Sequence, residues 1–200
     1  MKYIKPYYTT EQIRKWNTDE NNKLYILYTT KEIEKFIDDL PNLKIHFDKY
    51  KKIITSDNRP YGLHRARNEE IFKGEKIISV RKCQEPTFSY AKFDTYVSQT
   101  FNIIKTERIN LKYLIGILNS ELIKYWLKHK GKMQGNNYQV DKEPLCEIPI
   151  VFDKMYANEL TNEVDNILTK NIMSEEKINN IVYKIYNIDD EKREYIKENI

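Results

Sequence analysis

Apolar residues recur along this 200-residue chain with spacings that predict alternating strands and helices. Continuous apolar or β-branched runs at residues 24–28 and 76–81 indicate buried strands, and runs at residues 95–98 and 101–104 indicate two more. The strongest helical pattern covers residues 110–129, where the apolar positions return on one face. Strands therefore dominate the first half of the chain, and helices become frequent after it.

The first fifty residues also contain two helix-start patterns. Thr followed three residues later by Gln or Glu is the capping-box signature. It occurs at residues 9–12, where it predicts a short helix through Trp16, and at residues 29–32, where it predicts a helix that ends at Pro41. Helical apolar spacing over residues 43–54 predicts a further helix.

Helical patterns return in the last quarter of the chain. Two prolines bracket residues 145–148, which read as a short strand-like segment. Amphipathic helices are predicted over residues 156–168 and 174–185, and Asp189 is the expected N-cap of a last short helix. Acidic helices of this kind are more often packing elements than sites.

These elements predict an α+β fold: a mixed, irregular β-sheet with packed helices and a C-terminal helical subdomain. A chain of this length forms one large domain or two small ones. We expect one domain over residues 1–152 and a helical subdomain over residues 153–200, packed on the first domain or on a partner domain.

Charge is distributed unevenly, although the net charge of +4 is modest. Residues 44–92 hold twelve cations against six acids, a net charge of +6, and residues 124–142 have a net charge of +4. Residues 143–200 have a net charge of −6. Two basic blocks and an acidic end predict one face for a polyanion and a separate region for another role.

The first basic stretch, residues 59–94, places cations on a loop, a strand and a second loop. Rigidly presented Arg and Lys side chains are what the binding of a nucleic acid requires. The cations expected mainly at phosphates are Arg59, Arg65, Arg67, Lys73 and Lys76, and His64 is expected to belong to the same DNA-binding surface. The side chains expected to approach base edges are Arg81, Lys82 and Gln84. The alternative is that these are ordinary solvated charges flanking a strand.

The second basic stretch, residues 128–139, is a glycine-bearing segment dense in amides and lysines, predicted to be a loop. Asn and Gln can pair with adenine, and Lys or Arg with guanine, in the DNA major groove. The candidate base readers are Lys132, Gln134, Asn136, Asn137 and Gln139, with Tyr138 supporting or stacking. A flexible polar loop remains the alternative, because Gly-Asn-Asn is also common turn chemistry.

The residue patterns of familiar active sites are absent from the sequence. The histidines lack neighbours at metal-ligand spacing, and no phosphate-binding glycine loop or nucleophile motif occurs. The acidic cluster at residues 189–192 superficially resembles a nuclease site but has the pattern of a helix start. We therefore expect no catalytic residue and no metal site in this chain.

Location is predicted from equally simple features. No apolar run reaches the length of a membrane span, the first residues lack a signal-peptide core, and Cys83 and Cys146 are too few for a disulfide framework. We expect reduced thiols, a cytoplasmic location and no membrane contact.

Three segments, in order, resemble the TaqI-like C-terminal specificity domain, the target-recognition domain of adenine-specific DNA methyltransferases and type IIG restriction-modification enzymes. The first segment is His-Arg-Ala-Arg at residues 64–67 with the strand after it. The second is residues 113–120, Tyr-Leu-Ile-Gly-Ile-Leu-Asn-Ser, with Asn119 and Ser120 expected on the polar side of the helix. The third runs from Tyr138 through Ile-Pro-Ile to the closing helices.

The resemblance implies sequence-specific recognition of double-stranded DNA. It also implies methyltransferase or nuclease domains in the same or a partner polypeptide, because this chain contains neither the cofactor-binding glycine motif nor the Asn-Pro-Pro-Tyr-type motif of such enzymes. The chain alone is then no enzyme, and it looks like a piece of a larger enzyme or a separate specificity subunit. S-adenosylmethionine is the cofactor implied for the full enzyme, with Mg²⁺ if a nuclease is present.

Other functions remain open at this point. The chain can be a protein-interaction module whose acidic helices dock a methyltransferase or nuclease subunit, or an RNA-binding domain that uses its tyrosines for stacking. An independent enzyme is disfavoured, because paired catalytic groups are missing from the sequence.

Overall fold

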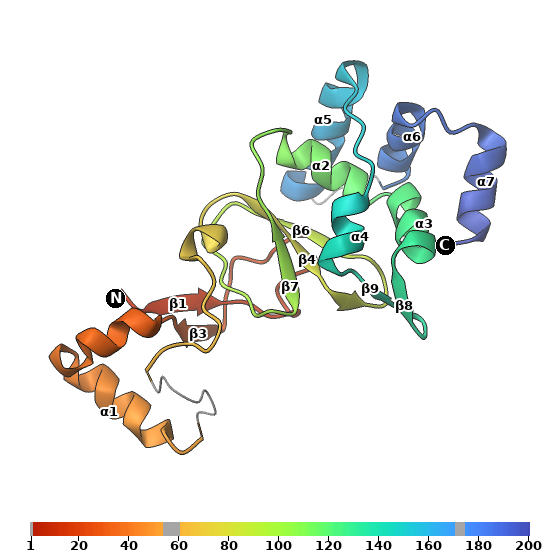
Figure 1. Cartoon of the computed structure of the whole chain (residues 1–200). Coiled ribbons are helices and arrows are strands. Elements are labelled where there is room, and N and C mark those ends of the chain that lie inside the picture. Colours follow the sequence, from red (N-terminus) through yellow and green to blue (C-terminus); the bar gives the residue numbers. More distant parts are fainter. Residues whose placement is uncertain (1, 54–60, 171–174) are drawn as a thin grey trace.

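The computed structural model describes residues 2–53, 61–170 and 175–200, so Arg59 and Ser174 lie outside the described residues. A four-stranded sheet of order β2-β6-β4-β7 forms the centre. A two-stranded ribbon with helix α1 extends from one side of it, and the C-terminal helices gather at the other (Figure 1). A third, three-stranded sheet lies beside these helices.

The central sheet is built around β4 (Lys76–Val80), in which every residue is buried. β4 runs antiparallel to both β6 (Phe88–Ala91) and β7 (Phe101–Ile104). β2 (Trp16–Asn17) pairs in parallel with β6. The strands predicted from the β-branched runs at 76–81 and 101–104 are thereby confirmed.

The predicted strand at residues 95–98 is wrong. Tyr96 makes only an isolated bridge to Tyr7, and Thr95 donates its backbone N–H to the carbonyl of Phe72 at 2.8 Å. The segment passes beside the sheet instead of joining it, and β6, which the apolar pattern did not reveal, takes the place next to β4.

Alternate residues of β4 face two separate cores, as strand geometry requires. Ile77 belongs to the core shared with α2 (Leu111–Leu118), α5 (Lys154–Lys170) and α6 (Glu175–Ile185). Ile78 belongs to the second core, on the other face. The buried aromatic residues of this second core are Tyr8, Tyr28, Phe72, Tyr96 and Phe101.

The predicted helix over residues 110–129 is two helices, α2 and α3 (Glu121–Lys130). Asn119 and Ser120 separate them and are buried, with 7% and 1% of their surface exposed, so the expected position on a polar face is wrong. Ser120 is the N-cap of α3, because its Oγ accepts the backbone N–H of Ile123 at 3.4 Å. The side-chain oxygen of Ser120 therefore starts a new helix.

The C-terminal helices α5, α6 and α7 (Asp190–Glu198) form where the pattern predicted them. α5 approaches α2 closely at Gly116, where a Cβ atom would lie 2.9 Å from the Leu160 side chain. Asp189 caps α7 by accepting the backbone N–H of Lys192 at 2.9 Å. The acidic cluster at 189–192 thus contains the helix cap that its pattern indicated.

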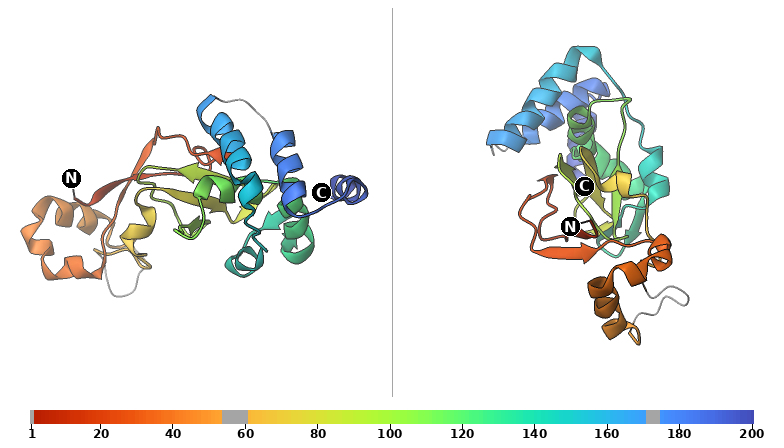
Figure 2. Two further views of the ribbon diagram at one scale, coloured as in Figure 1. Left: turned by 90° about the horizontal axis from the view of Figure 1, so that it is seen from above. Right: turned by 90° about the vertical axis from the view of Figure 1, so that its left-hand side faces the viewer.

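The N-terminal arm consists of an antiparallel ribbon, β1 (Ile4–Tyr7) with β3 (Leu24–Leu27), and the helices beyond it (Figure 2). The predicted strand at 24–28 forms, but it is not buried: Leu24 is 51% and Tyr25 68% exposed. The ribbon stands apart from the central sheet, so its outer side chains have no sheet to cover them.

The two capping-box predictions do not produce the expected helices. At residues 9–12 the backbone N–H of Thr9 donates to the Gln12 side chain at 3.1 Å, but only one turn follows before Trp16 enters β2. Residues 29–40 contain two short 3₁₀ helices, Lys31–Lys35 and Ile37–Asp39. Pro41 begins a helix instead of ending one, because proline fits the first turn, where no N–H bond is needed. This helix, α1 (Pro41–Tyr50), follows the predicted apolar spacing.

The remaining elements are short. A 3₁₀ turn covers Glu69–Phe72, and residues 145–148, predicted to be strand-like, lie largely in helix α4 (Lys142–Glu147). The third sheet consists of β5 (Lys82–Cys83), β8 (Lys132–Gln134) and β9 (Asn137–Gln139).

The predicted fold class is confirmed: the described residues form a mixed structure of seven α-helices and three small open sheets, with helices at the C-terminal end. The boundary between residues 152 and 153 stays a prediction. Among the described residues, no helix combines the length and the apolar character needed to cross a membrane.

Candidate nucleic-acid interface

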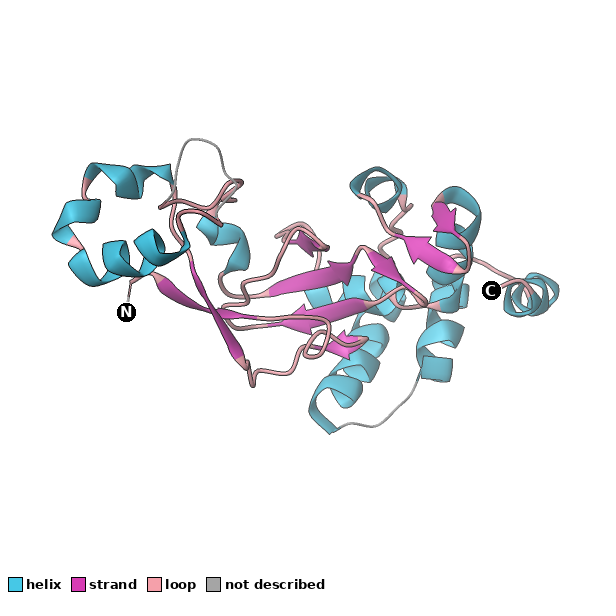
Figure 3. Cartoon of the chain, turned by 90° about the horizontal axis from the view of Figure 1, so that it is seen from below, coloured by secondary structure: helices cyan, strands magenta, loops and turns pink. Residues whose placement is uncertain are grey.

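The two basic stretches meet in the three-stranded sheet β5-β9-β8 (Figure 3). Gln139 in the central strand lies opposite Lys82 of β5 on one side and Lys132 of β8 on the other. Asn137 lies opposite Gln134. Because directly opposite residues and residues two apart in a strand share a face, these five side chains form one surface, which we call the polar sheet face.

The polar sheet face is accessible. Lys82, Lys132 and Gln134 are exposed, and Asn137 and Gln139 are half-buried. Gln84 follows β5 directly and is exposed, as is Asn136 at the hairpin turn. Most of these amides are unengaged: among the described residues, no hydrogen bond involves the side chains of Gln84, Gln134, Asn136 or Asn137.

The opposite face of this sheet is apolar and packs inward. Tyr138 lies opposite Cys83 and Met133, and only 5% of its surface is exposed within the main core. Burial raises the pKa of Tyr138, and it raises the pKa of the Cys83 thiol to about 11. Of the two roles expected for Tyr138, the geometry favours support from within the core over stacking on a base.

The predicted loop at 128–139 is instead the end of α3, through Lys130, followed by an ordered β-hairpin over residues 132–139. Its turn residues are Gly135 and Asn136, and Gly135 has a φ of +59° with no atom within 4 Å of where a Cβ would be. Gly135 is therefore needed for its backbone conformation and not for space. Positive φ at the first turn residue alone is the pattern of a type II′ hairpin turn, whose twist matches that of the flanking strands.

A carboxylate that sequence reasoning missed holds the base of this hairpin. Asp141 Oδ1 accepts from Arg81 Nη2 at 2.7 Å, and Asp141 Oδ2 accepts from Gln139 Nε2 at 2.7 Å. The backbone N–H of Val140 donates to the carbonyl of Arg81 at 2.7 Å. The bond from Arg81, with that from Gln139, lowers the pKa of Asp141. The available signal was that Asp141 is the one acid among five lysines in residues 124–142.

The last turn of α3 extends the basic surface towards β8. Lys128, His129 and Lys130 are all exposed there, one residue before the hairpin begins. Lys128 Nζ donates to the Asn199 carbonyl at 2.9 Å, and the His129 ring lies 4.3 Å from that of Tyr125. Within the described part of the chain, Lys130 forms no ion pair.

Two cations of the first basic stretch are engaged inside the protein. Lys76 has 0% exposure, and its ammonium donates to the carbonyls of Gly74 and of Phe93, the latter at 2.6 Å. Burial lowers the pKa of Lys76 to about 8. Arg67 Nη2 donates to the carbonyls of Val97 at 2.7 Å and Ser98 at 2.9 Å. Both side chains therefore join segments of the fold.

The other cations of that stretch are more accessible. Lys73 is paired with Glu70 at 2.6 Å, whereas His64 and Arg65 are exposed and form no ion pair among the described residues. Arg59 lies outside the described residues.

The turn at residues 97–99 connects the two basic regions. Arg67 donates to the carbonyls of residues 97 and 98, at the start of this turn. Arg81 Nη1 donates to the Gln99 carbonyl, at its end, at 3.3 Å. Figure 1 places the segment around residue 65 nearer the N-terminal arm than the hairpin. Residues 82–83 pair directly with the hairpin, and the 64–67 segment is linked to Arg81 through this turn.

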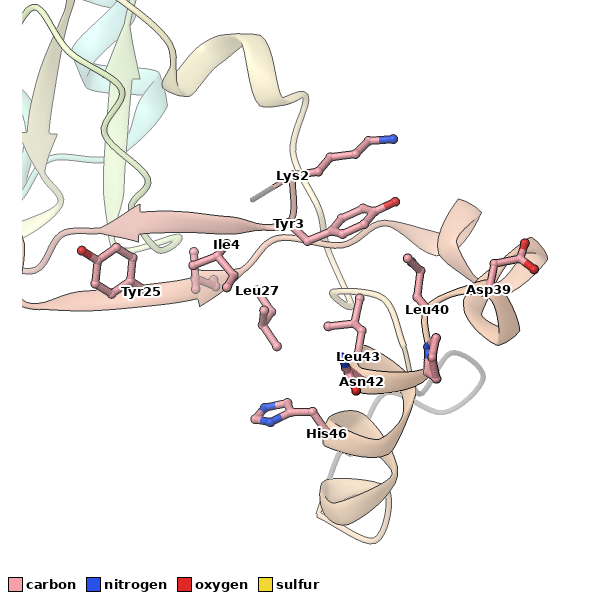
Figure 4. Close-up of a pocket in the computed structure, with 12 residues that line it drawn as sticks. Lys2, Tyr3, Ile4, Tyr25, Leu27, Asp39, Leu40, Asn42, Leu43 and His46 are labelled. Atoms are coloured by element: carbon pink, nitrogen blue, oxygen red, sulfur yellow. The ribbon is translucent and has the colours of Figure 1, made fainter.

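A groove of about 680 Å³ between the ribbon and α1 is a different kind of site (Figure 4). Its walls are mainly apolar, with Ile4, Leu27, Leu40 and Leu43 beside His46. No cluster of three or more potential metal-binding side chains occurs among the described residues.

Comparison with known proteins decides the family. The model of the TaqI-like C-terminal specificity domain matches residues 4–150, which include the whole polar sheet face. The chain belongs to this family. The resemblance seen in the sequence is confirmed, and this TaqI-like specificity domain has curated relatives among Type II methyltransferases.

Two of these relatives are the Type II methyltransferases M.HincII and M.HindII of Haemophilus influenzae, each 26% identical over 162 residues. The matches cover 72% of this chain but only 32% and 31% of the relatives. In three dimensions the specificity domain is similar to MmeI, a Type IIL restriction-modification enzyme solved in complex with DNA, with a TM-score of 0.70 and 10% identity. That similarity covers 99% of this chain and 30% of MmeI, and at this identity it concerns the fold.

Proposed function

We propose that this chain recognises a specific double-stranded DNA sequence for a restriction-modification adenine methyltransferase, and that the polar sheet face reads the bases. The observation that carries the proposal is the pairing of Gln139 with Lys82 and Lys132 across one sheet. Two stretches more than forty residues apart supply these side chains to one exposed surface. Membership of a family of specificity domains supports a nucleic acid as the target of that surface.

The dimensions of the sheet fit the DNA major groove. Neighbouring strands lie about 4.8 Å apart, so Lys82 and Lys132 on the outer strands are separated by about 10 Å at the backbone. The major groove is about 12 Å wide and accepts a two-stranded ribbon, so the β8–β9 hairpin fits inside it and β5 lies at its edge. With β9 along the groove, Gln139 and Asn137 meet base edges, while Lys82 and Lys132 approach the outer base edges and the phosphates beside them.

Exposed cations outside the sheet complete the proposed interface. His64 and Arg65, and Lys130 at the end of α3, are placed to contact phosphates at the ends of the site. Such contacts bind every sequence and fix the register of the duplex. Arg67 and Lys76 are left out of the proposed contacts because internal carbonyls occupy their donors.

The rest of the proposed machinery belongs to other domains. The curated relatives are methyltransferases about three times as long as the matched segment, so methyl transfer from S-adenosylmethionine is proposed for a domain of the same or a partner polypeptide. A nuclease domain, if joined to it, would use Mg²⁺. In that assembly this chain selects the site, and the catalytic domain flips the adenine out of the duplex.

Protein docking is a second candidate function, favoured by the apolar groove of Figure 4 and by exposed Tyr25 at its rim. RNA binding at the polar sheet face is less favoured, because recognition of single strands relies on exposed aromatic rings and Tyr138, the aromatic residue of that sheet, is buried. Docking and DNA recognition are compatible in one chain. A surface that only docks a protein would show no duplex binding.

The test is selection from a randomised duplex pool with the full chain. We expect the recovered duplexes to share a short motif, and single-stranded RNA of matching length to compete poorly. Gln134→Ala or Asn137→Ala should relax one position of the motif. The matched control is Asn21→Ala, an exposed amide in the N-terminal arm. Recovery of unrelated sequences, or equal competition by RNA, would contradict the proposal.

A further inference from the structure

The side-chain amide of Gln139 differs from the other amides of the polar sheet face. Its Nε2 donates to Asp141 Oδ2 at 2.7 Å, whereas Gln134 and Asn137 have no side-chain hydrogen bond among the described residues. A carboxylate has only acceptors, so it can bind the NH₂ end of an amide but not the oxygen end. Asp141 therefore fixes which end of the Gln139 amide points towards it.

Asp141 itself is held in place and kept ionised. Arg81 Nη2 donates to its other oxygen at 2.7 Å, and Arg81 Nη1 is tied to the Gln99 carbonyl at 3.3 Å. Lys132, on the same face, also lowers the pKa of Asp141. An ionised carboxylate beside a DNA-binding surface would repel phosphates. The two hydrogen bonds of Asp141, from Arg81 and from Gln139, indicate that it is there to hold these side chains.

We infer that Asp141 is a positioning residue that locks the Gln139 amide in one orientation, so that Gln139 reads an adenine on one strand of the duplex only. The inference rests on the proposed function, because it assumes that the polar sheet face meets base edges. Among the described residues, the Gln139 oxygen and its second N–H have no partner, and together they form the ordered acceptor–donor pair that matches N6 and N7 of adenine.

The order of these two groups is what gives strand selectivity. A freely rotating amide exchanges its oxygen and nitrogen positions by a half turn, and it can therefore adapt to an A·T or a T·A pair. The Gln139 amide cannot do so without placing its oxygen against the Asp141 carboxylate. A correct bidentate amide–adenine pair discriminates about 5- to 150-fold against the wrong base pair.

The first experiment measures the lock without DNA. In ¹H–¹⁵N spectra of the full chain, the side-chain NH₂ signals of Gln139, assigned with Gln139→Ala, should show one proton shifted downfield and protected from exchange. Asp141→Asn should abolish both effects, because an asparagine can pair with either end of the amide. Glu85→Gln removes a nearby negative charge that pairs with Lys124 and should leave the signals unchanged. Identical Gln139 signals in Asp141→Asn and the parent protein would overturn the lock.

The second experiment measures base choice. At one position of the selected motif, the preference for A·T over T·A should fall towards unity in Asp141→Asn and in Gln139→Ala, and it should persist in Glu85→Gln. A general rise in affinity from the lost charge should appear equally in Asp141→Asn and Glu85→Gln. An unchanged preference in Asp141→Asn would overturn the inference while the proposed function stands. No duplex binding by any form would overturn the proposed function and the reading role together, and the amide spectra would still decide the lock.

Discussion

The side-chain amide of Asn119 pairs with the backbone of Phe88 in both directions: Oδ1 accepts the Phe88 N–H at 3.1 Å, and Nδ2 donates to the Phe88 carbonyl at 2.9 Å. All four groups are buried. The amide therefore acts like a short extra strand on the edge of β6 that faces away from β4, and it joins the break between α2 and α3 to the central sheet.

We predict that Asn119→Ala lowers the free energy of unfolding by about 3 kcal/mol, because it leaves a buried N–H and a buried carbonyl of Phe88 without partners. Asn110→Ala is the matched control. Asn110 caps α2 at the surface through the N–H groups of Lys112 and Tyr113, and its loss should cost about 1 kcal/mol. Urea unfolding followed by circular dichroism measures both. An Asn119→Ala effect no larger than that of Asn110→Ala would contradict this role.

Arg65→Ala and Arg67→Ala should separate a surface cation from a structural one. Arg67 donates to the Val97 and Ser98 carbonyls and lies over the Phe72 ring at 4.9 Å, so Arg67→Ala should lower the free energy of unfolding by about 2 kcal/mol. Arg65 is exposed, and Arg65→Ala should change stability by less than about 0.5 kcal/mol while weakening duplex binding for all sequences. Equal stability of the two variants would show that Arg67 does not hold the 97–99 turn.

Lys76 should make the stability of the protein depend on pH. Burial lowers its folded-state pKa from 10.5 to about 8, so between these values the unfolded chain binds a proton that the folded protein does not. The free energy of unfolding should therefore rise with pH across this window. Lys76→Met should remove that rise, measured as the difference between the two proteins by urea unfolding. Cys83 and the buried tyrosines are present in both proteins, so the effect of their titration cancels in this difference. A difference that is constant with pH would contradict the lowered pKa.

The elements that could be predicted are those whose burial follows from the apolar pattern of their own residues. The run of β-branched residues in β4 is apolar on both faces, so only a central strand buries it. The helices α5 and α6 carry regular apolar stripes on one face. In such segments the periodicity contains the information about packing.

The failed predictions depend on contacts between distant segments. The spacing of residues 110–129 continues through Asn119 as if the helix were unbroken, and the break follows from the pairing of Asn119 with Phe88, 31 residues away. The run at 24–28 is apolar enough for a buried strand, but β3 pairs only with β1 and stays exposed. Neither outcome can be read from the local pattern.

The candidate site was predictable in its residues and not in its geometry. Both basic stretches were found from charge and amide content, but their union in one sheet depends on the pairing of Lys82 with Gln139. Arg67 and Lys76 resemble other exposed cations in sequence, and only the fold places carbonyls around them. Asp141 was missed because an acid in a basic stretch has no obvious part in binding a polyanion.

The most direct test of the account is the salt dependence of duplex-DNA affinity, measured for the parent chain and for Lys82→Ala/Lys132→Ala. Lys170→Ala/Lys177→Ala is the matched control, since it removes two exposed lysines at the junction of α5 and α6, away from the hairpin in Figure 1. Each phosphate contact contributes about 0.9 to the slope of log affinity against log salt. We predict that the slope flattens by up to about 1.8 in Lys82→Ala/Lys132→Ala and stays unchanged in the control. An equal slope in all three proteins, with each one folded, would contradict the claim that the polar sheet face binds DNA.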